Sequence, residues 1–168
     1  MHVAHVITRL IIGGAQQNTL LTCEEQHREY GDEVTLITGP AIGPEGSLID
    51  RARAAGFRVI ELDSMRRSIH PWHDWRSYRD LLAVLRELRP DLVHTHSSKA
   101  GIIGRYAAAK LKLPAVHTIH GSAFHFGQHP LAFRLYRFLE RRAARWSDHL
   151  ISVCDSLTDQ YVEAGVAP

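Results

Sequence analysis

The chain has 168 residues, a length typical of one domain that buries about 70% of the surface of its unfolded chain. Its 20 lysines and arginines and its 18 aspartates and glutamates give a formal net charge of +2, which excludes nucleic-acid binding through bulk charge. Two cysteines, Cys23 and Cys154, make no disulfide framework, and no stretch approaches the roughly 20 apolar residues of a membrane span, so we expect a cytoplasmic protein.

Strand-like and helix-like segments alternate along the whole chain. Apolar runs of strand length predict six strands, at 3–7, 34–38, 57–62, 92–95, 115–119 and 149–153. Helices are predicted at 13–30, 47–55, 75–88, 98–111, 131–146 and 156–164, and a loop at 63–73. The alternation predicts an α/β fold: one domain over residues 1–168 with a doubly wound, mainly parallel, Rossmann-like sheet of six strands, or seven, and helices on both faces. The expected strand order is 3-2-1-4-5-6.

Polar turns follow four of the predicted strands. They are Gly-Gly-Ala-Gln at 13–16, His-Ser-Ser-Lys at 96–99, His-Gly-Ser at 120–122 and Cys-Asp-Ser at 154–156. In a doubly wound sheet ligands bind at the carboxyl ends of the strands, near the point where the winding reverses. We therefore expect the four turns to converge on one cleft at the edge of the sheet.

The turn after the fourth strand shows what such a cleft can bind. His96 is expected to lead the strand out towards solvent, and Ser97 and Ser98 are expected to cap the following helix. Lys99 would stand in the first turn of that helix, where the dipole disfavours a cation, so we expect an anionic or hydroxyl-rich ligand close to it. In the same helix Gly104 is expected to allow close packing on the sheet.

Several familiar site types are absent from the sequence. There is no G-x-G-x-x-G after the first strand, no G-x-x-x-x-G-K-[ST] phosphate loop and no G-x-S-x-G elbow. Twelve histidines raise the question of a metal. The spacing of His94, His96, His117 and His120 matches no zinc signature, and no acidic or cysteine ligand stands near them, so no metal site is predicted. His94 and His117 are interpreted as strand packing.

Five motifs occur in a defined order: G-G-A at 13–15, R-P-D-L-V-H-T-H-S-S-K-A-G at 89–101, G-R-Y-A-A at 104–108, P-A-V-H-T-I-H-G at 114–121 and I-S-V-C-D-S at 151–156. Together they resemble the N-terminal domain of a family 4, GT-B fold glycosyltransferase, and the resemblance covers essentially the whole chain. The relatives that it suggests are bacterial enzymes that build exopolysaccharide, capsule or lipopolysaccharide.

The resemblance implies a retaining transfer of a sugar from a nucleotide-sugar to a glycan or lipid-linked acceptor, without a required metal or other cofactor. It assigns acceptor binding to this domain. The nucleotide, the Arg and Lys that hold its phosphates and the E-x7-E carboxylates belong to a C-terminal Rossmann domain that this chain lacks. The chain alone is therefore expected to be inactive.

The family's positions also suggest site residues. His120 would be the catalytic-site residue, because a neutral imidazole can both donate and accept hydrogen bonds from a sugar. Gly13 and Gly14 would approach the donor pyrophosphate, although an ordinary strand-to-helix turn is the alternative. The acceptor-binding residues implied are Gln16, Ser97, Ser98, Lys99, Gly121, Arg66 and Arg67. A solvated loop is an equal alternative for the two arginines.

The segment 131–146 carries a stripe of basic residues. Arginines recur at helical spacing in the segment 131–146, at Arg134, Arg137, Arg141 and Arg145, and Arg142 adds a fifth arginine to this basic stripe. They indicate either a solvated face, which we slightly prefer, or peripheral contact with an anionic membrane, at its cytoplasmic face, or with a lipid-linked acceptor.

Two other functions are alternatives to the transferase: the N-terminal domain of a sugar-nucleotide epimerase, and a stand-alone binding or regulatory half-protein. The Ser-Ser-Lys turn favours the transferase over the epimerase.

Overall fold

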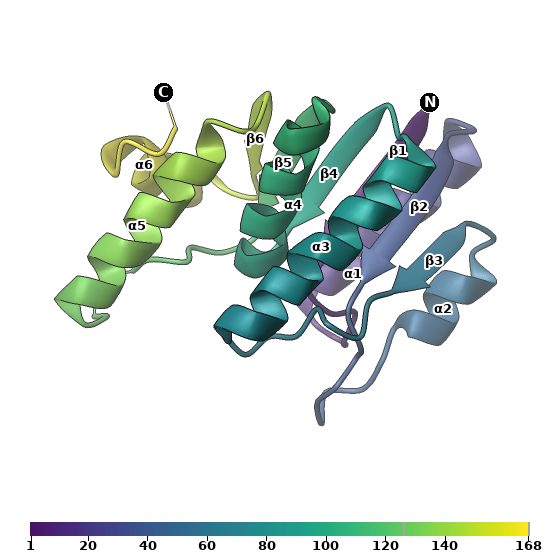
Figure 1. The fold of residues 1–168 in the computed structure, drawn as a ribbon, viewed down its shortest axis with the longest axis horizontal. Coiled ribbons are helices and arrows are strands. Elements are labelled where there is room, and N and C mark those ends of the chain that lie inside the picture. Colours follow the sequence, from purple (N-terminus) through teal and green to yellow (C-terminus); the bar gives the residue numbers. More distant parts are fainter. Residues whose placement is uncertain (126, 168) are drawn as a thin grey trace.

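The computed structural model describes residues 1–125 and 127–167, which fold around one central sheet (Figure 1). The strands are β1 (His2–Ile7), β2 (Glu33–Thr38), β3 (Arg58–Glu61), β4 (Leu92–His96), β5 (Ala115–Ile119) and β6 (His149–Ser152). They lie in the order β3-β2-β1-β4-β5-β6 and all neighbouring pairs are parallel. The predicted fold class and strand order are confirmed, and the described residues contain no seventh strand.

Helices cover both faces of the sheet. They are α1 (Gly14–Glu29), α2 (Ile49–Ala54), α3 (Pro71–Leu88), α4 (Ser98–Leu111), α5 (Pro130–Ala144) and α6 (Asp155–Glu163). Side chains of α1 and α2 form one buried cluster with the sheet, and those of α3 and α4 form another on the opposite face. Within the described residues, no helix is both long enough and apolar enough to cross a membrane.

The helix α3 begins four residues earlier than expected, inside the segment predicted as a loop. Pro71 stands at its first position, where a fixed φ suits the helix and a missing N–H is not needed. The carboxylate of Asp74 accepts a hydrogen bond from the backbone N–H of His70, which precedes the helix. This early start brings Asp74 towards the carboxyl edge of the sheet.

The helix α4 lies close to the sheet because two of its residues lack a Cβ. A Cβ on Gly101 would stand 2.5 Å from the His117 ring, and one on Gly104 would stand 2.6 Å from Thr95 Cγ2. The predicted close packing of this helix is therefore confirmed. The contact fixes the start of α4, and with it the turn after β4, against the carboxyl edge of the sheet.

Candidate functional site

The turns after β1 and β4 are joined by side-chain hydrogen bonds. The Thr8 and Ser97 hydroxyl oxygens are 2.7 Å apart, and Thr8 Oγ1 also accepts a hydrogen bond from the Ala100 backbone N–H at 3.2 Å. Thr8, from a distant part of the chain, thus caps α4. The prediction that Ser97 or Ser98 caps this helix was wrong, because Ser97 makes no capping bond and turns its hydroxyl towards β1.

The backbone of Ser97 has an unusual conformation. Its φ is 61° and its ψ is 153°, a region that residues with a Cβ rarely occupy. Such a conformation costs about 1–3 kcal/mol and is found mainly at sites where it serves a function. Here it lets one residue join two strand ends and face two neighbouring hollows.

The first hollow, of about 670 Å³, lies at the ends of β1 and β4. Cavities of this size accommodate small ligands. It unites five predicted acceptor residues, namely Gln16, Arg67, Ser97, Ser98 and Lys99. Arg66 is not among its described lining residues; it is exposed and donates to the Asp63 carbonyl. Sequence reasoning missed Arg9, Asp74 and Gln128, which also line this hollow.

Lys99 has a partner inside the protein. Its ammonium group donates to the Asp74 carboxylate at 2.5 Å and to the Ser68 carbonyl. The carboxylate compensates the unfavourable position of a cation at a helix N-terminus. The sequence argument that Lys99 needs an anionic ligand therefore no longer holds, although Lys99 does line the hollow.

The second hollow surrounds His120. Gly121 and Ala15 line it too, and Ser97 and Ser98 belong to both hollows, so the two adjoin at the turn after β4. Three of the four predicted turns meet in this way. The described linings of both hollows leave out the fourth turn, at 154–156.

The backbone conformation of Gly13, which precedes helix α1, does not require a glycine. Its φ of −179° is extended and any residue adopts it, but a Cβ on Gly13 would stand 2.7 Å from Gln16 Oε1, at the end of a flexible side chain. Gly14 is exposed, and a Cβ built on it would meet nothing within 4 Å. The free space over Gly14 is consistent with close approach of a ligand but does not by itself define one.

His120 stands at the end of a chain of hydrogen-bonded side chains. Its Nε2 lies 3.1 Å from His96 Nδ1, His96 Nε2 lies 3.1 Å from His5 Nδ1, and His5 Nε2 lies 2.7 Å from Gln26 Oε1. His96 is buried in β4, so the expectation that it leads the strand out to solvent was wrong. Sequence reasoning missed His5 and Gln26; the predicted pairing of the first and fourth strands was the signal that could have revealed His5.

Burial keeps these imidazoles neutral. Loss of solvent lowers the pKa of His5 to about 4 and that of His94 to about 3. The pKa of His96 is lowered by burial and then by the neighbouring histidines, and that of half-buried His120 is lowered by burial. At neutral pH the groups therefore act as hydrogen-bonding dipoles rather than as cations.

Three of these side chains also lie close enough together to raise the question of a metal. Ring nitrogens of His5, His94 and His96 lie within 4.8 Å of one another. However, His5 and His96 direct nitrogens at each other, and His94 Nε2 is 2.8 Å from the Thr118 hydroxyl. A metal needs ligand nitrogens that all point at one ion at about 2.0–2.1 Å. His94 and His117 are buried, as predicted for strand packing.

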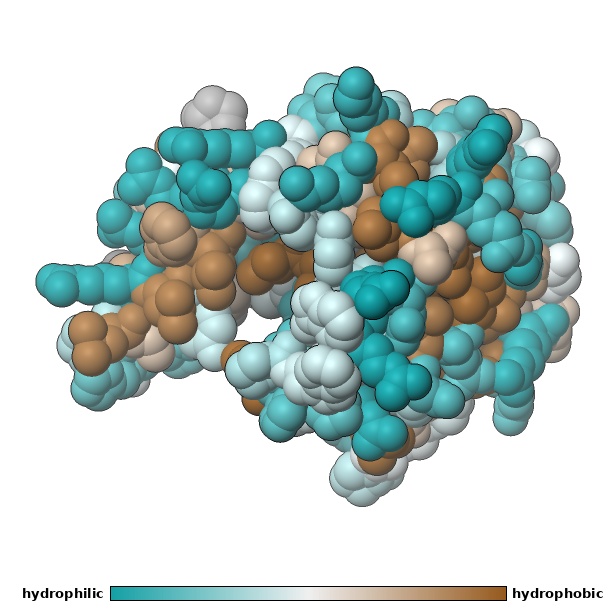
Figure 2. All heavy atoms as spheres, viewed as in Figure 1, coloured by the Kyte–Doolittle hydropathy of each residue, from teal (hydrophilic) through white to brown (hydrophobic). Residues whose placement is uncertain are grey.

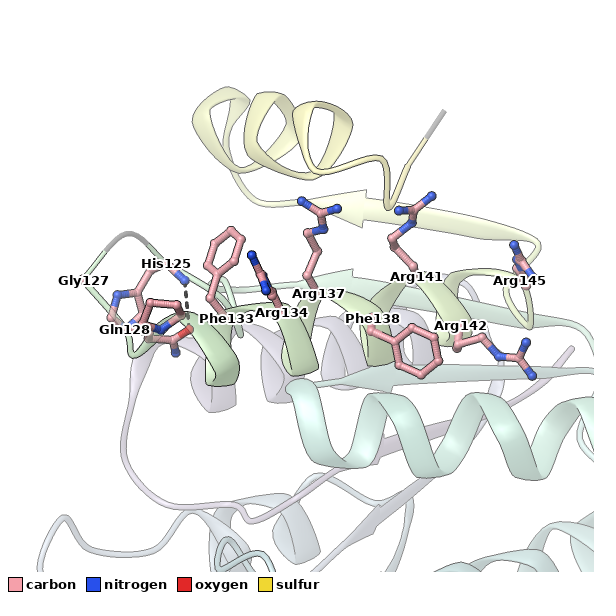
Figure 3. Close-up of a pocket in the computed structure, with 11 residues that line it drawn as sticks. His125, Gly127, Gln128, Phe133, Arg134, Arg137, Phe138, Arg141, Arg142 and Arg145 are labelled. Atoms are coloured by element: carbon pink, nitrogen blue, oxygen red, sulfur yellow. Dashed lines mark hydrogen bonds between the residues drawn. The ribbon is translucent and has the colours of Figure 1, made fainter.

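A third hollow runs along α5 and is strongly basic. The five arginines of the stripe line it, together with Phe133 and Phe138. Figure 3 shows Arg137 and Arg141 extending from α5 towards the C-terminal segment, and Phe138 and Arg142 on another side of the helix. Glu140 does not offset this charge, because it is 1% exposed and its carboxylate binds Arg105 at 2.8 Å.

Comparison with known proteins gives a family for residues 13–168, which match the glycosyl transferase 4-like domain. A curated relative from Escherichia coli, UDP-Gal:alpha-D-GlcNAc-diphosphoundecaprenol alpha-1,3-galactosyltransferase, is 34% identical over 89% of this chain. The chain spans only 37% of that relative's length.

Solved structures share the fold at low sequence identity. One is a putative UDP-N-acetylglucosamine 2-epimerase from Listeria monocytogenes, with a TM-score of 0.71 at 16% sequence identity. The match covers 99% of this chain and 43% of the epimerase chain. The Anabaena protein Alr3699/HepE, solved in complex with UDP-glucose, has a TM-score of 0.70 at 16% identity over 98% of this chain and 41% of its own. The fold alone thus does not exclude an epimerase.

Proposed function

Because the chain belongs to the glycosyl transferase 4-like domain family, we propose that it is the acceptor-binding half of a retaining, metal-independent glycosyltransferase that uses a nucleotide-sugar. The observation that carries the proposal is the meeting of Gln16, Ser97, Ser98 and Arg67 around one hollow that adjoins His120. Hydroxyl and amide groups suit the hydroxyls of a sugar, and a guanidinium suits a phosphate.

The acceptor class that we propose is a sugar linked through a diphosphate to a lipid. The name of the E. coli relative describes such an acceptor, and that relative matches most of this chain. The hollow offers both kinds of group that such a molecule needs, since polar side chains and Arg67 line it together. The enzyme would act at the cytoplasmic face of the inner membrane in the synthesis of a surface polysaccharide.

Within this function His120 would hydrogen-bond the donor sugar near the reacting carbon. Its neutral imidazole can accept a hydrogen bond from a sugar hydroxyl without adding a positive charge next to the developing oxocarbenium ion. The backbone N–H groups at Gly13 and Gly14 would face the donor pyrophosphate, at the N-terminus of the 16-residue helix α1.

A binding titration tests the acceptor assignment. A water-soluble, short-chain lipid diphosphate carrying N-acetylglucosamine is titrated into the wild-type chain and into the variants Arg67→Gln and Arg66→Gln. We expect Arg67→Gln to weaken binding about tenfold, the effect of one charge-assisted hydrogen bond, and Arg66→Gln to leave it unchanged. Equal affinity of the wild type and Arg67→Gln would contradict the placement of the acceptor in this hollow.

We also propose that α5 contacts an anionic membrane. None of its five stripe arginines forms an ion pair with any residue that the structure describes. Leu131, Leu135 and Phe138 are 68%, 55% and 58% exposed on the same helix, and Figure 2 shows apolar and polar surface side by side over this part of the molecule. Exposed apolar side chains beside arginines are typical of helices that lie in a membrane interface.

Sedimentation with liposomes tests this contact. The double variant Arg137→Glu/Arg141→Glu should lose binding to vesicles that contain anionic lipid. Arg76→Glu/Arg79→Glu, which places the same charges on the exposed part of α3, should keep it. If the wild type binds neither anionic nor neutral vesicles, the membrane contact is refuted.

A further inference from the structure

A continuous line of hydrogen bonds connects helix α1 with the second hollow. It runs from the Gln26 side chain on α1 through His5 of β1 and His96 of β4 to His120 after β5. Both inner histidines are buried, with 0% of His5 and 1% of His96 exposed. His94 lies beside this line rather than in it, because its Nε2 is bonded to Thr118.

The first bond decides the direction of all the others. The Gln26 carbonyl oxygen only accepts, so His5 must carry its proton on Nε2 and present a bare Nδ1. His96 must then donate from Nε2 and accept at Nδ1. His120 in turn donates from Nε2 to His96. Every neutral imidazole in the line thus has one allowed tautomer.

The consequence for the site is a defined polarity at His120. With its proton on Nε2, Nδ1 is a hydrogen-bond acceptor, and no partner for it is found among the residues that the structure describes. We propose that Gln26 is a positioning residue that holds His120 in the Nε2–H tautomer, so that Nδ1 accepts a hydrogen bond from a substrate hydroxyl. The substrate part rests on the proposed function, whereas the tautomer is a property of the free protein.

The opposite orientation of the Gln26 amide would reverse the line. An NH2 group facing His5 would require an acceptor at His5 Nε2, and each following imidazole would carry its proton on Nδ1. His120 would then offer a donor to the substrate in place of an acceptor. The amide of one residue outside both described hollows therefore selects which group meets the substrate.

Nitrogen NMR of 15N-histidine-labelled protein reads the tautomers directly, without substrate. The His120 signals are assigned by their loss in His120→Gln. In the wild type we expect Nε2 protonated and Nδ1 bare. Gln26→Leu removes the acceptor at nearly constant shape, and we expect it to shift the His120 tautomer ratio about fivefold towards Nδ1–H, the effect of one neutral hydrogen bond.

Two further variants complete the test. Gln26→Glu can only accept from His5 and should keep the wild-type tautomer, in contrast to Gln26→Leu. Gln17→Leu, an exposed change on the same helix, should also leave it unchanged. The proposal is overturned if Gln26→Leu has the wild-type ratio, or if Gln26→Glu and Gln26→Leu shift it equally.

Kinetics of the full-length enzyme separate this inference from the proposed function. We expect Gln26→Leu to lower kcat with KM unchanged, and Gln26→Glu to restore part of kcat. If Gln26→Leu shifts the tautomer but leaves turnover unchanged, Gln26 still positions His120, and the proposed contact of His120 with the substrate is refuted.

Discussion

His120 gains its properties from neighbours that are distant in sequence. Partial burial lowers the pKa of the imidazole and keeps it neutral, and His96 behind it fixes the ring orientation. On one side it faces the hollow that it shares with Gly121, Ser97 and Ser98. A neutral, oriented imidazole beside serine hydroxyls is well suited to hold a sugar rather than to bind a phosphate.

We predict that His120→Ala lowers the turnover of the full-length enzyme about 100-fold, because one preorganised hydrogen bond near the reacting carbon is lost. The fold should persist, since only the outermost imidazole of the line is removed. His149→Ala, at the amino end of β6, is the matched control and should keep wild-type turnover. Steady-state kinetics with circular dichroism check both, and an unimpaired His120→Ala enzyme would exclude the role.

The buried histidines make stability depend on pH. His5 has a pKa of about 4 in the folded chain and about 6.5 when unfolded, so below about pH 6.5 the unfolded state binds the extra proton. Stability is therefore fully present above about pH 6.5 and falls by about 3 kcal/mol for His5 alone as pH drops to about 4. His94 and His96 act in the same direction.

We predict that His5→Phe flattens this dependence by about 1 kcal/mol per pH unit between about pH 6 and pH 4.5, while exposed His149→Phe does not. Urea unfolding across that pH range gives the free energies. An equally steep slope in His5→Phe and in the wild type would mean that His5 is not buried in its neutral form.

Among the elements, α4 has the tightest packing constraints. Glycines set its distance from the sheet, Thr8 caps it, and a buried ion pair joins it to α5. Arg105 and Glu140 are 0% and 1% exposed, and Arg105 Nε also donates to the Gly101 carbonyl. Arg105 Nη1 and Glu140 Oε1 have no hydrogen-bond partner among the described residues. The pair thus fixes the relative position of two helices without satisfying all of its buried polar atoms.

We predict that Glu140→Ala lowers the free energy of unfolding by about 3–5 kcal/mol, because it leaves a buried guanidinium without its counter-ion. The double variant Arg105→Met/Glu140→Leu should cost far less, since it removes both charges and keeps the volume. Urea denaturation of Arg105→Met, of Glu140→Leu and of the double variant gives the coupling. Additive effects of the two changes would show that the charges do not interact.

For the whole molecule, the site faces outward at the carboxyl edge of the sheet. Both hollows lie there, and the chain corresponds to 37% of the length of its E. coli relative. Under the proposed function, this edge would hold the acceptor, and catalysis would take place between it and a second domain that holds the nucleotide.

We predict that residues 1–168 alone bind the acceptor analogue but transfer no sugar, because under the proposed function the groups that hold the nucleotide belong to a second domain. The assay compares product from a nucleotide-sugar and the lipid diphosphate acceptor with that of the full-length enzyme. Turnover by residues 1–168 would show that this half carries the donor site as well.

The sequence by itself determined the elements, their order and the edge of the sheet at which the site lies. Hydrophobic periodicity depends on neighbours a few residues apart, so the strands and helices could be predicted from local pattern. The order of the strands in the sheet then followed from the winding rule for such folds. The G-G-A, Ser-Ser-Lys and His-Gly turns were assigned to the same edge for that reason, and the family followed from their order.

Only the tertiary structure decided how the side chains pair across that edge. Thr8 in place of a serine caps α4, Asp74 neutralises Lys99, and Gln26 reaches His120 through two buried rings. These contacts join residues between 21 and 92 positions apart. Their formation depends on strand register and on an unusual φ at Ser97, neither of which leaves a local signal in the sequence.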